Sequence, residues 1–546
     1  MQNTTTATLP GGAERTAASV DESREESVIR KYRWLILAGL ITAAVMEVLD
    51  TTIINVALPQ MAGNLGATQQ EISWVSTGYI LSNVVVLPMT AFFTATFGRR
   101  NYLTASIIIF VIASFLCGTA QSLASLVLWR IVQGAGGAAL LSTAQATLRQ
   151  IFPKEEQGMV QAIFLLGIIV APTLGPTLGG WITDNYAWHW CFFINVPIGI
   201  VSAFLVYTFL QDPKGQELRS GPVDWLGIGL LIAGVGSLQY LLEEGNSEDW
   251  FNSGLIVRLT VIAVVSLVGM VWWELSPRNK HPVISFRVLK NRNLSASIFL
   301  FVALGFGLYG GTFLFPLFTQ SLLHFTPTKT GLVMLPGGLI TGATALMCGA
   351  MLNGKKPLVD PRILISLGVA FFLLAMYQLG HLTTMAGEAD ARIPLMVRGV
   401  AFGLLFTPIN NSAYGSLKPS EAQEAAGLIN LSRQLGGSFG IAILSTYLTR
   451  HIQYHRVDLL ANITPTNPVF VERLHSLTAG LVSRGMPEVV ANQTAMKMIE
   501  GTVMQQATML AYNDSWMLIL LSFLVTAPAI LLLKKPKEGA VAVDAH

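Results

Sequence analysis

Two acidic residues stand in the middle of a long apolar segment near the start of the chain. Glu47 and Asp50 lie in AVMEVLDTTIINVALP, and a spacing of three places both side chains on one face of a helix. An ionised side chain near the centre of a bilayer costs at least about 2.5 to 3.5 kcal/mol on insertion scales, so each one retained there calls for a reason. The other charges in comparable apolar segments are Arg130, Arg398 and Arg433.

A carboxyl group of this kind is suited to carrying a proton. Burial in apolar surroundings favours its protonated form and a nearby guanidinium favours the ionised form, so the balance can allow exchange near neutral pH. We therefore predict Asp50 as the main protonation site, Glu47 as a second carboxyl and Arg130 as a partner in the same half. The alternative is a fixed ion pair that only orients helices. Arg398 and Arg433 lack an evident carboxylate in their own half, and a structural role for Arg398 that mirrors Arg130 is open.

The composition indicates a chain whose main solvent is lipid. Of 546 residues, 52% are hydrophobic and only 12% are charged, and the apolar residues come in runs long enough to cross a hydrocarbon core as helices. The net charge of +3 is small and its basic residues are scattered, which argues against a nucleic-acid partner. The three cysteines are widely spaced within apolar runs, so neither a disulfide framework nor a thiolate metal site is expected.

Fourteen apolar segments bounded by charges, Pro and Gly are expected to span the membrane as helices. They lie near residues 34–58, 72–95, 102–120, 123–148, 159–182, 190–210, 223–242, 254–274, 295–321, 331–352, 361–381, 393–414, 424–447 and 512–533. Basic residues gather in every second loop, as at Arg99 and Arg100, whereas the short loops on the other side contain only Lys329 and Arg392. The positive-inside rule therefore places both termini in the cytoplasm.

Two distant stretches of the chain read alike, which is typical of a transporter built from related halves; chance similarity of Gly-rich apolar segments is the alternative. LVLWRIVQGAGGAALL, FPKEEQG and LGPTLGG occur in the first half, and IPLMVRGVAFGLLF, KPSEAQEAAG and LGGSFGI follow in the same order in the second. We expect a polar cytoplasmic tail (1–32), a six-helix bundle (33–211), an inserted helix pair (212–275), a basic cytoplasmic linker (276–293), a second six-helix bundle (294–534) with a periplasmic loop (449–511), and a cytoplasmic tail (535–546).

Glycine-rich motifs mark the segments expected at 123–148 and 159–182. The second of these contains Gly175, Pro176, Gly179 and Gly180 within APTLGPTLGGWI, which a membrane helix tolerates because neighbouring helices and water satisfy the freed carbonyl groups. The glycines predict close helix packing, with or without a role in gating. A short turn with two cations, Gly98-Arg99-Arg100, follows the second span, and arginine at a membrane boundary is commonly an anchor.

Several of these motifs resemble one transporter family. LDTTIINVALP, WRIVQGAGGAALL, APTLGPTLGGWI and SRQLGGSFGIAIL are similar to the EmrB/QacA type of drug:proton antiporters, the fourteen-helix branch of the major facilitator superfamily, over nearly the whole chain from about 30 to 535. The resemblance implies an all-helical fold of two six-helix bundles with a central cavity and alternating access, and proton-driven export of drugs or other amphipathic compounds. It implies no cofactor beyond the proton gradient.

The resemblance also assigns roles to individual residues. Asp50 is the acidic position, Arg130 is the arginine followed by Gln133 and Gly134, and Gly175, Pro176, Gly179 and Gly180 form the antiporter motif. The loop at 91–100 departs from the superfamily pattern G-x-L-a-D-R-x-G-R-R. It keeps Gly98, Arg99 and Arg100 but has Ala91, Ala95 and Thr96 where the pattern has Gly, Asp and Arg, so any latch that uses the acidic residue is in doubt.

The 449–511 segment is similar to the outer loop of EmrB-like exporters. The resemblance implies a bacterial inner-membrane protein that works with a periplasmic adaptor and an outer-membrane channel, and the apolar residues of the segment indicate helical pieces able to lie on another protein. A partly ordered loop is the alternative. His451 and His455 have the spacing of a helical metal pair, but without a nearby acidic ligand a solvated face is favoured.

Other functions stay open at this stage. An importer that carries substrate and proton together would have the same fold, and an exporter of a lipid, fatty acid or siderophore would look much the same. The few charges suit large apolar or weakly cationic substrates. A membrane enzyme or receptor-like scaffold is disfavoured because the sequence has no metal constellation, phosphate-binding loop or nucleophile motif.

Overall fold

The regular elements of the described chain are all helices. The computed structural model describes residues 12–153, 156–212, 223–279, 282–352, 359–415, 417 and 421–533, and within 12–30 only the backbone. The predicted all-helical fold is therefore confirmed for these ranges. Polar side chains cap several helix starts: the Thr68 side chain accepts from the Glu71 N–H, and Asp224 accepts from the Gly227 N–H.

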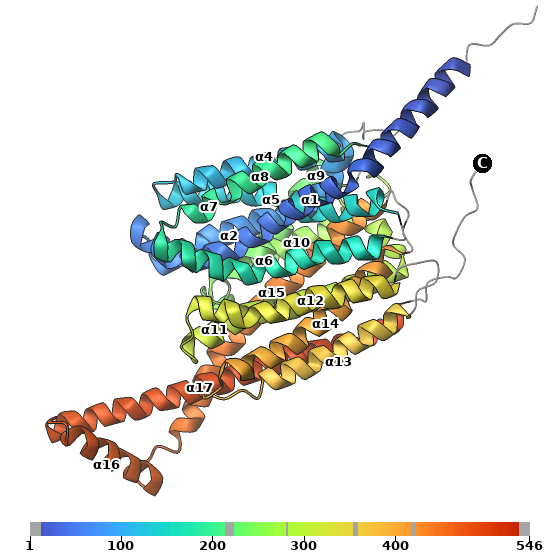
Figure 1. The fold of residues 1–546 in the computed structure, drawn as a ribbon. Coiled ribbons are helices and arrows are strands. Elements are labelled where there is room, and N and C mark those ends of the chain that lie inside the picture. Colours follow the sequence, from blue (N-terminus) through green and yellow to red (C-terminus); the bar gives the residue numbers. More distant parts are fainter. Residues whose placement is uncertain are drawn as a thin grey trace, which may run out of the picture.

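The first half of the chain forms one group of helices (Figure 1). In chain order they are α1 (Gly12–Leu65), α2 (Gln69–Val86), a 3-10 turn η1 (Leu87–Met89), α3 (Thr90–Phe97), α4 (Arg99–Gly118), α5 (Leu123–Ile151), α6 (Gln157–Asn185), α7 (Trp190–Phe193) and α8 (Asn195–Phe209). Pro88 near the start of η1 accompanies the break between α2 and α3 within one predicted span. The part of the predicted cytoplasmic tail from residue 12 onward is helical and forms the start of α1.

The remaining helices form the inserted pair and the second group. The pair is α9 (Trp225–Glu244) and α10 (Gly254–Leu275), with η2 (Trp250–Asn252) between them, and η3 (Phe286–Lys290) follows. The second group comprises α11 (Arg292–Ser321), α12 (Pro327–Leu352), α13 (Pro361–Leu379), α14 (Glu388–Tyr414), α15 (Ala422–Leu460), α16 (Pro468–Val482), α17 (Glu488–Thr526) and η5 (Ala527–Leu532).

Twelve of the described helical segments are long and apolar enough to cross a membrane. The other two predicted spans, 159–182 and 424–447, lie in α6 and α15, which have 29 and 39 residues. Within α6, a shorter apolar stretch is described at Met159–Ile168. The count of fourteen spans therefore stays a prediction.

The two halves repeat the same packing pattern. The first helix packs along the fifth in each half (α1 with α6, α11 with α15), and the second packs along the fourth (α2 with α5, α12 with α14). The halves meet where α6 lies along α12 and α5 against α15, as Figure 1 shows for α6 and α12. The α9 helix contacts α2 of one half and α15 of the other.

The segment predicted as the loop 449–511 is largely a continuation of two helices. The α15 helix runs on to Leu460 and α17 already begins at Glu488, so the ends of both helices belong to the protrusion that α16 completes (Figure 1). Polar contacts join the two long helices: His455 Nε2 lies 2.7 Å from Asp514 Oδ2, and Arg456 Nη2 forms an ion pair with Glu500 Oε1 at 2.8 Å. His455 thus pairs with a carboxylate, while the His451 ring stacks on Tyr447 at 3.6 Å.

Candidate functional site

Asp50 and Arg130 form an ion pair inside the first half. Asp50 lies on α1 and Arg130 on α5, and Arg130 Nη1 is 2.5 Å from Asp50 Oδ2. The two side chains are 0% and 1% exposed, so the pair is removed from solvent. The structure therefore places together the carboxyl and the guanidinium that the sequence predicts as partners.

Amide side chains complete the surroundings of this pair. Gln133 Nε2 and Asn195 Nδ2 both donate to Asp50 Oδ1, at 3.0 and 2.7 Å. Arg130 donates through Nε to the Val75 carbonyl at 2.9 Å, and its guanidinium lies over the Tyr79 ring at 4.2 Å. The family resemblance predicted Gln133 as a site residue, whereas nothing in the sequence pointed to Asn195. Each oxygen of Asp50 thus accepts at least one hydrogen bond from a buried side chain.

Glu47 has a separate set of partners and faces the second half of the chain. Asn83 Nδ2 donates to Glu47 Oε1 at 3.3 Å, and the Leu141 N–H donates to Oε2 at 3.1 Å. Asn83 Oδ1 in turn accepts from Gln434 Nε2 of α15 at 3.3 Å. One turn of α1 therefore carries a carboxyl inside the first half, Asp50, and another, Glu47, that is linked through Asn83 to the second half.

Arg433 also lies where the halves meet. Its Nη2 donates to Asn430 Oδ1 at 2.8 Å, and Asn430 Nδ2 donates to Gln145 Oε1 of α5 at 3.1 Å. These amide contacts between α5 and α15 were not predicted from the sequence. Neutral amides in apolar segments are less conspicuous than charges, although Asn and Gln commonly join membrane helices by hydrogen bonds.

The glycines of the two motifs lie at close helix contacts. A Cβ atom at Gly134 would overlap the Tyr79 carbonyl oxygen and the Ser82 hydroxyl of α2. One at Gly175 would overlap the Thr52 hydroxyl of α1, and one at Gly179 would lie 2.7 Å from the Ile53 carbonyl oxygen. Gly180 is buried, and the side chain of Pro176 lies outside the described set. Because Thr52 and Ile53 follow Asp50 closely, α6 packs directly against the part of α1 that holds the carboxyl.

Comparisons with known proteins agree with this architecture. The family model described as Major Facilitator Superfamily matches residues 40–441. The chain belongs to the major facilitator superfamily. It is 34% identical to the fatty acid resistance protein FarB of Neisseria gonorrhoeae over 92% of this chain and 96% of that protein. It is 32% identical to the multidrug export protein EmrB of Escherichia coli K12, over 91% and 94% of the two chains.

Within the superfamily the chain belongs to the EmrB-type transporters, as the sequence motifs predicted. EmrB of Haemophilus influenzae is 35% identical over 81% of this chain and 86% of that protein. A crystal structure of the human organic anion transporter MFSD10 shares the fold, with a TM-score of 0.53 at 12% identity over 92% of this chain and 99% of that one. The protein is thus a multi-pass membrane transporter and not an enzyme.

In the loop that carries the superfamily motif, the two arginines contact a carboxylate from another part of the chain. Gly98 adopts a positive φ of 81°, which suits glycine, and starts α4 with Arg99 and Arg100. Arg99 donates to Gln150 Oε1 and to the Gln211 carbonyl, and its Nε is 4.0 Å from Asp212 Oδ1. The Arg100 N–H also donates to Asp212 Oδ1, at 3.1 Å. Asp212, after α8, therefore supplies a carboxylate to a loop that lacks the usual acidic residue.

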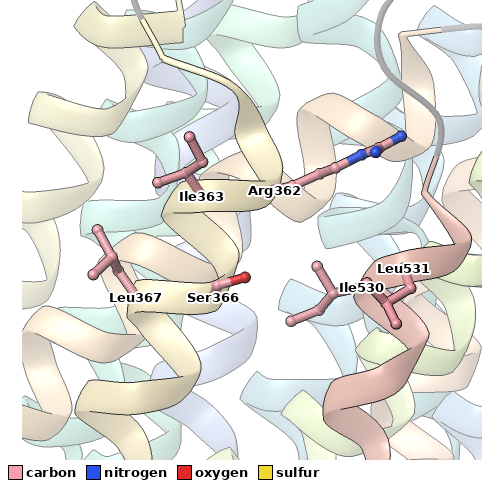
Figure 2. Close-up of a pocket in the computed structure, with 6 residues that line it drawn as sticks. All are labelled: Arg362, Ile363, Ser366, Leu367, Ile530 and Leu531. Atoms are coloured by element: carbon pink, nitrogen blue, oxygen red, sulfur yellow. The ribbon is translucent and has the colours of Figure 1, made fainter.

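A cavity of about 420 Å³ lies apart from the ion pair, between α13 and η5 (Figure 2). It is lined by Arg362, Ile363, Ser366, Leu367, Ile530 and Leu531. Ile363 and Leu531 are 55% and 80% exposed, so this cavity is an outward-facing groove between two helices. The predicted site residues do not line it, and it is not included in the candidate site.

Proposed function

We propose that this protein is a proton-coupled antiporter that exports drugs and other amphipathic small molecules across the inner membrane by alternating access. The observation that carries the proposal is the Asp50–Arg130 pair, which is buried between two helices of an apolar bundle. A buried charge pair contributes little to stability compared with apolar packing, so its retention favours a functional role. The relatives named as multidrug export proteins support drugs as substrates.

The pair gives a physical route from proton binding to helix movement. Protonation removes the charge of Asp50, and Arg130, Gln133 and Asn195 then hold a neutral group in place of an anion. The attraction between α1 and α5 weakens, and the unpaired guanidinium favours a rearrangement that brings it a new acceptor. One proton moved through about 100 mV gains about 2.3 kcal/mol, enough for roughly a forty-fold substrate gradient.

Alternating access then requires the contacts between the halves to break and re-form. The Asn83 side chain donates to Glu47 and accepts from Gln434 of the other half. A change in the charge of Glu47 therefore alters a contact between the halves. The Gln145–Asn430 hydrogen bond lies in the same interface, next to Arg433. Glu47 is thus the second carboxyl of the proposed cycle, and no cofactor beyond the proton gradient takes part.

Direction of transport is tested in everted membrane vesicles. Exchange predicts that vesicles acidified inside accumulate a fluorescent substrate, and that an uncoupler abolishes at least about nine-tenths of this uptake. Symport of substrate and proton predicts release of preloaded substrate instead. Accumulation that persists in the presence of the uncoupler would contradict proton coupling.

Fatty acids are a second candidate substrate class, supported by the name of the relative from Neisseria gonorrhoeae. A single specific lipid or siderophore is the narrower alternative to a broad drug range. The everted-vesicle assay separates these cases when it is repeated with a cationic dye, a fluorescent fatty acid and a ferric siderophore. Uptake of only one of the three indicates a specific exporter.

The protrusion of α15, α16 and α17 is proposed as the surface for a periplasmic adaptor, which would join the transporter to an outer-membrane channel. Val469 of α16 and Val489 at the start of α17 are 73% and 71% exposed. Further exposed apolar side chains on the same segment are Val457, Val482, Val490, Met496 and Met498. Several exposed apolar side chains on one protruding segment suit an interaction surface. This placement also fits both termini in the cytoplasm, because the start of α1 projects from the opposite end of the molecule (Figure 1).

Acidic substitutions on this surface are expected to leave transport by the purified protein intact but to lower the drug resistance of cells. The double variant Val469→Asp/Val489→Asp should transport normally in proteoliposomes, yet lose most of the resistance conferred on cells, on the order of tenfold in inhibitory concentration, because a charge buried in an interface is costly. Ser483→Asp, at an exposed polar position of the same segment, is the matched control. Full resistance with both valines replaced would contradict adaptor docking at this surface.

A further inference from the structure

The second half of the chain repeats the arginine of the first half but not its carboxylate. Arg130 lies on the fourth helix of its half and faces Asp50 on the first, and Arg398 lies on the corresponding α14. A Cβ atom at Gly311 of α11, the first helix of the second half, would lie 2.7 Å from Arg398 Nη1. Arg398 therefore faces a glycine on the helix that corresponds to the carrier of Asp50.

Within the described residues, Arg398 has no acceptor for its guanidinium. The side chain is only 8% exposed, and Nη1 is fully buried without a hydrogen-bond partner in this part of the chain. Arg130 has Asp50 Oδ2, Gln133 Oε1 and the Val75 carbonyl, whereas Ala401 stands three residues after Arg398, where Gln133 follows Arg130. An unpaired guanidinium in a membrane interior is costly, so Arg398 is expected to acquire an anionic partner during the transport cycle.

The surroundings of Arg398 suit the head of an amphipathic anion. The Phe402 ring centre is 5.9 Å from the guanidinium carbon, and Trp516 Cζ3 lies 3.9 Å from the Cβ position at Gly311. Apart from the α11 backbone, the atom nearest to that position is Arg398 Nη1 itself. The guanidinium thus packs directly against the α11 backbone at Gly311, where any side chain would meet Nη1. Guanidinium groups bind carboxylates with two parallel hydrogen bonds, and the aromatic rings favour an apolar chain beside them.

We propose that Arg398 binds the carboxylate of transported amphipathic anions, so that a substrate supplies in the second half the charge that Asp50 supplies in the first. This inference rests on the proposed transport function, but it concerns equilibrium binding and does not require a proton gradient. It makes Arg398 a residue that determines substrate charge preference. Protonation of Asp50 and binding of an anion at Arg398 would each change the charge balance of one half.

The test compares two ligands of equal chain length, dodecanoate and dodecyltrimethylammonium, on the full-length protein in nanodiscs of zwitterionic lipid. Dissociation constants are measured for the wild type, Arg398→Gln, Arg398→Lys and Arg258→Gln. Arg398→Gln is expected to raise the ratio of the dodecanoate constant to the cation constant at least tenfold, and Arg398→Lys by less. Arg258→Gln, which replaces an exposed arginine of α10, is expected to leave the ratio unchanged.

Thermal unfolding of the same samples separates binding from folding. Arg398→Gln removes an unpaired charge and is expected to unfold at or above the wild-type temperature, whereas Arg130→Gln, which leaves Asp50 unpaired, should unfold at a lower one. Equal weakening of both ligands by Arg398→Gln, or a dodecanoate constant within twofold of the wild type, would overturn the proposal. Failure of the wild type to bind dodecanoate would overturn it as well. None of these results bears on the vesicle assay of proton exchange.

Discussion

Replacement of Asp50 by asparagine is expected to reduce proton-driven efflux to the background of cells without the transporter. Asparagine has nearly the same shape but cannot exchange a proton, so the step that couples the gradient to α1 and α5 is lost. It also leaves Arg130 as a buried cation without its counter-ion, which typically costs about 3 to 5 kcal/mol of stability. Dye efflux from energised cells, at matched amounts of transporter in the membrane, measures the effect.

A double variant separates the two consequences of this change. Asp50→Asn/Arg130→Gln removes both charges, and replacing a buried pair by neutral groups is often close to neutral for stability. We expect the double variant to regain thermal stability but not efflux. Asp184→Asn, which neutralises an exposed carboxylate on α6, serves as the control and should export normally. Normal efflux by Asp50→Asn would show that the Asp50 carboxylate is structural. Glu47 would then be the candidate for the coupling site.

Gly175→Ala is expected to lower efflux at least about tenfold, through a helix contact and not through charge. The added methyl group would overlap the Thr52 hydroxyl and lie 2.6 Å from Thr52 Cβ, so α6 and α1 must move apart beside Asp50. In an open position the same substitution would favour the helix by about 1 kcal/mol. Gly229→Ala on α9 is the matched control, because nothing lies within 4 Å of its added methyl group.

A second substitution, at Thr52, should restore the efflux that Gly175→Ala removes. Thr52→Gly deletes the hydroxyl and the Cβ atom that the new methyl group meets, so Gly175→Ala/Thr52→Gly is expected to recover most of the efflux that the single change loses. Thr52→Ala removes the hydroxyl but keeps the Cβ atom, and should recover less. If Thr52→Gly gives no recovery while protein levels are matched, the glycine acts by some means other than this α1–α6 contact.

The charged part of the candidate site could be predicted from the sequence because charges in apolar segments are few. With one arginine and two carboxyls available in the spans of the first half, the pairing of Asp50 with Arg130 followed from the cost of leaving either alone. Which carboxyl pairs with Arg130 is decided by the rotation of α1, and the structure gives Glu47 different partners, Asn83 and the Leu141 N–H.

The neutral partners could not be chosen in the same way. Asn195 and Asn83 stand in apolar segments that contain other amides and hydroxyls, and sequence spacing does not show which of them share a layer of the bundle. Asp212 was missed for a related reason. It lies after the last helix of the first half and reaches Arg99 and Arg100 only through the packing of α8 against α4.

Helix ends were harder to predict than helix positions. Hydropathy marks the apolar part of a segment, whereas α15 continues well after its apolar part and α17 begins well before its own. Their outer parts are polar enough to read as a loop, yet the His455–Asp514 and Arg456–Glu500 pairs join them side by side as helices. The break between α2 and α3 shows the opposite case, in which one apolar run contains more than one helix.

Proton movement caused by substrate in proteoliposomes tests the central claim most directly. The wild type and Asp50→Asn are reconstituted with a pH-sensitive dye inside, and a substrate gradient is imposed without any initial pH difference. The account predicts that downhill movement of substrate out of the vesicles drives protons into them for the wild type, and that Asp50→Asn gives no pH change. Substrate movement by the wild type without a pH change, or an undiminished pH change with Asp50→Asn, would contradict proton-coupled exchange through this carboxyl.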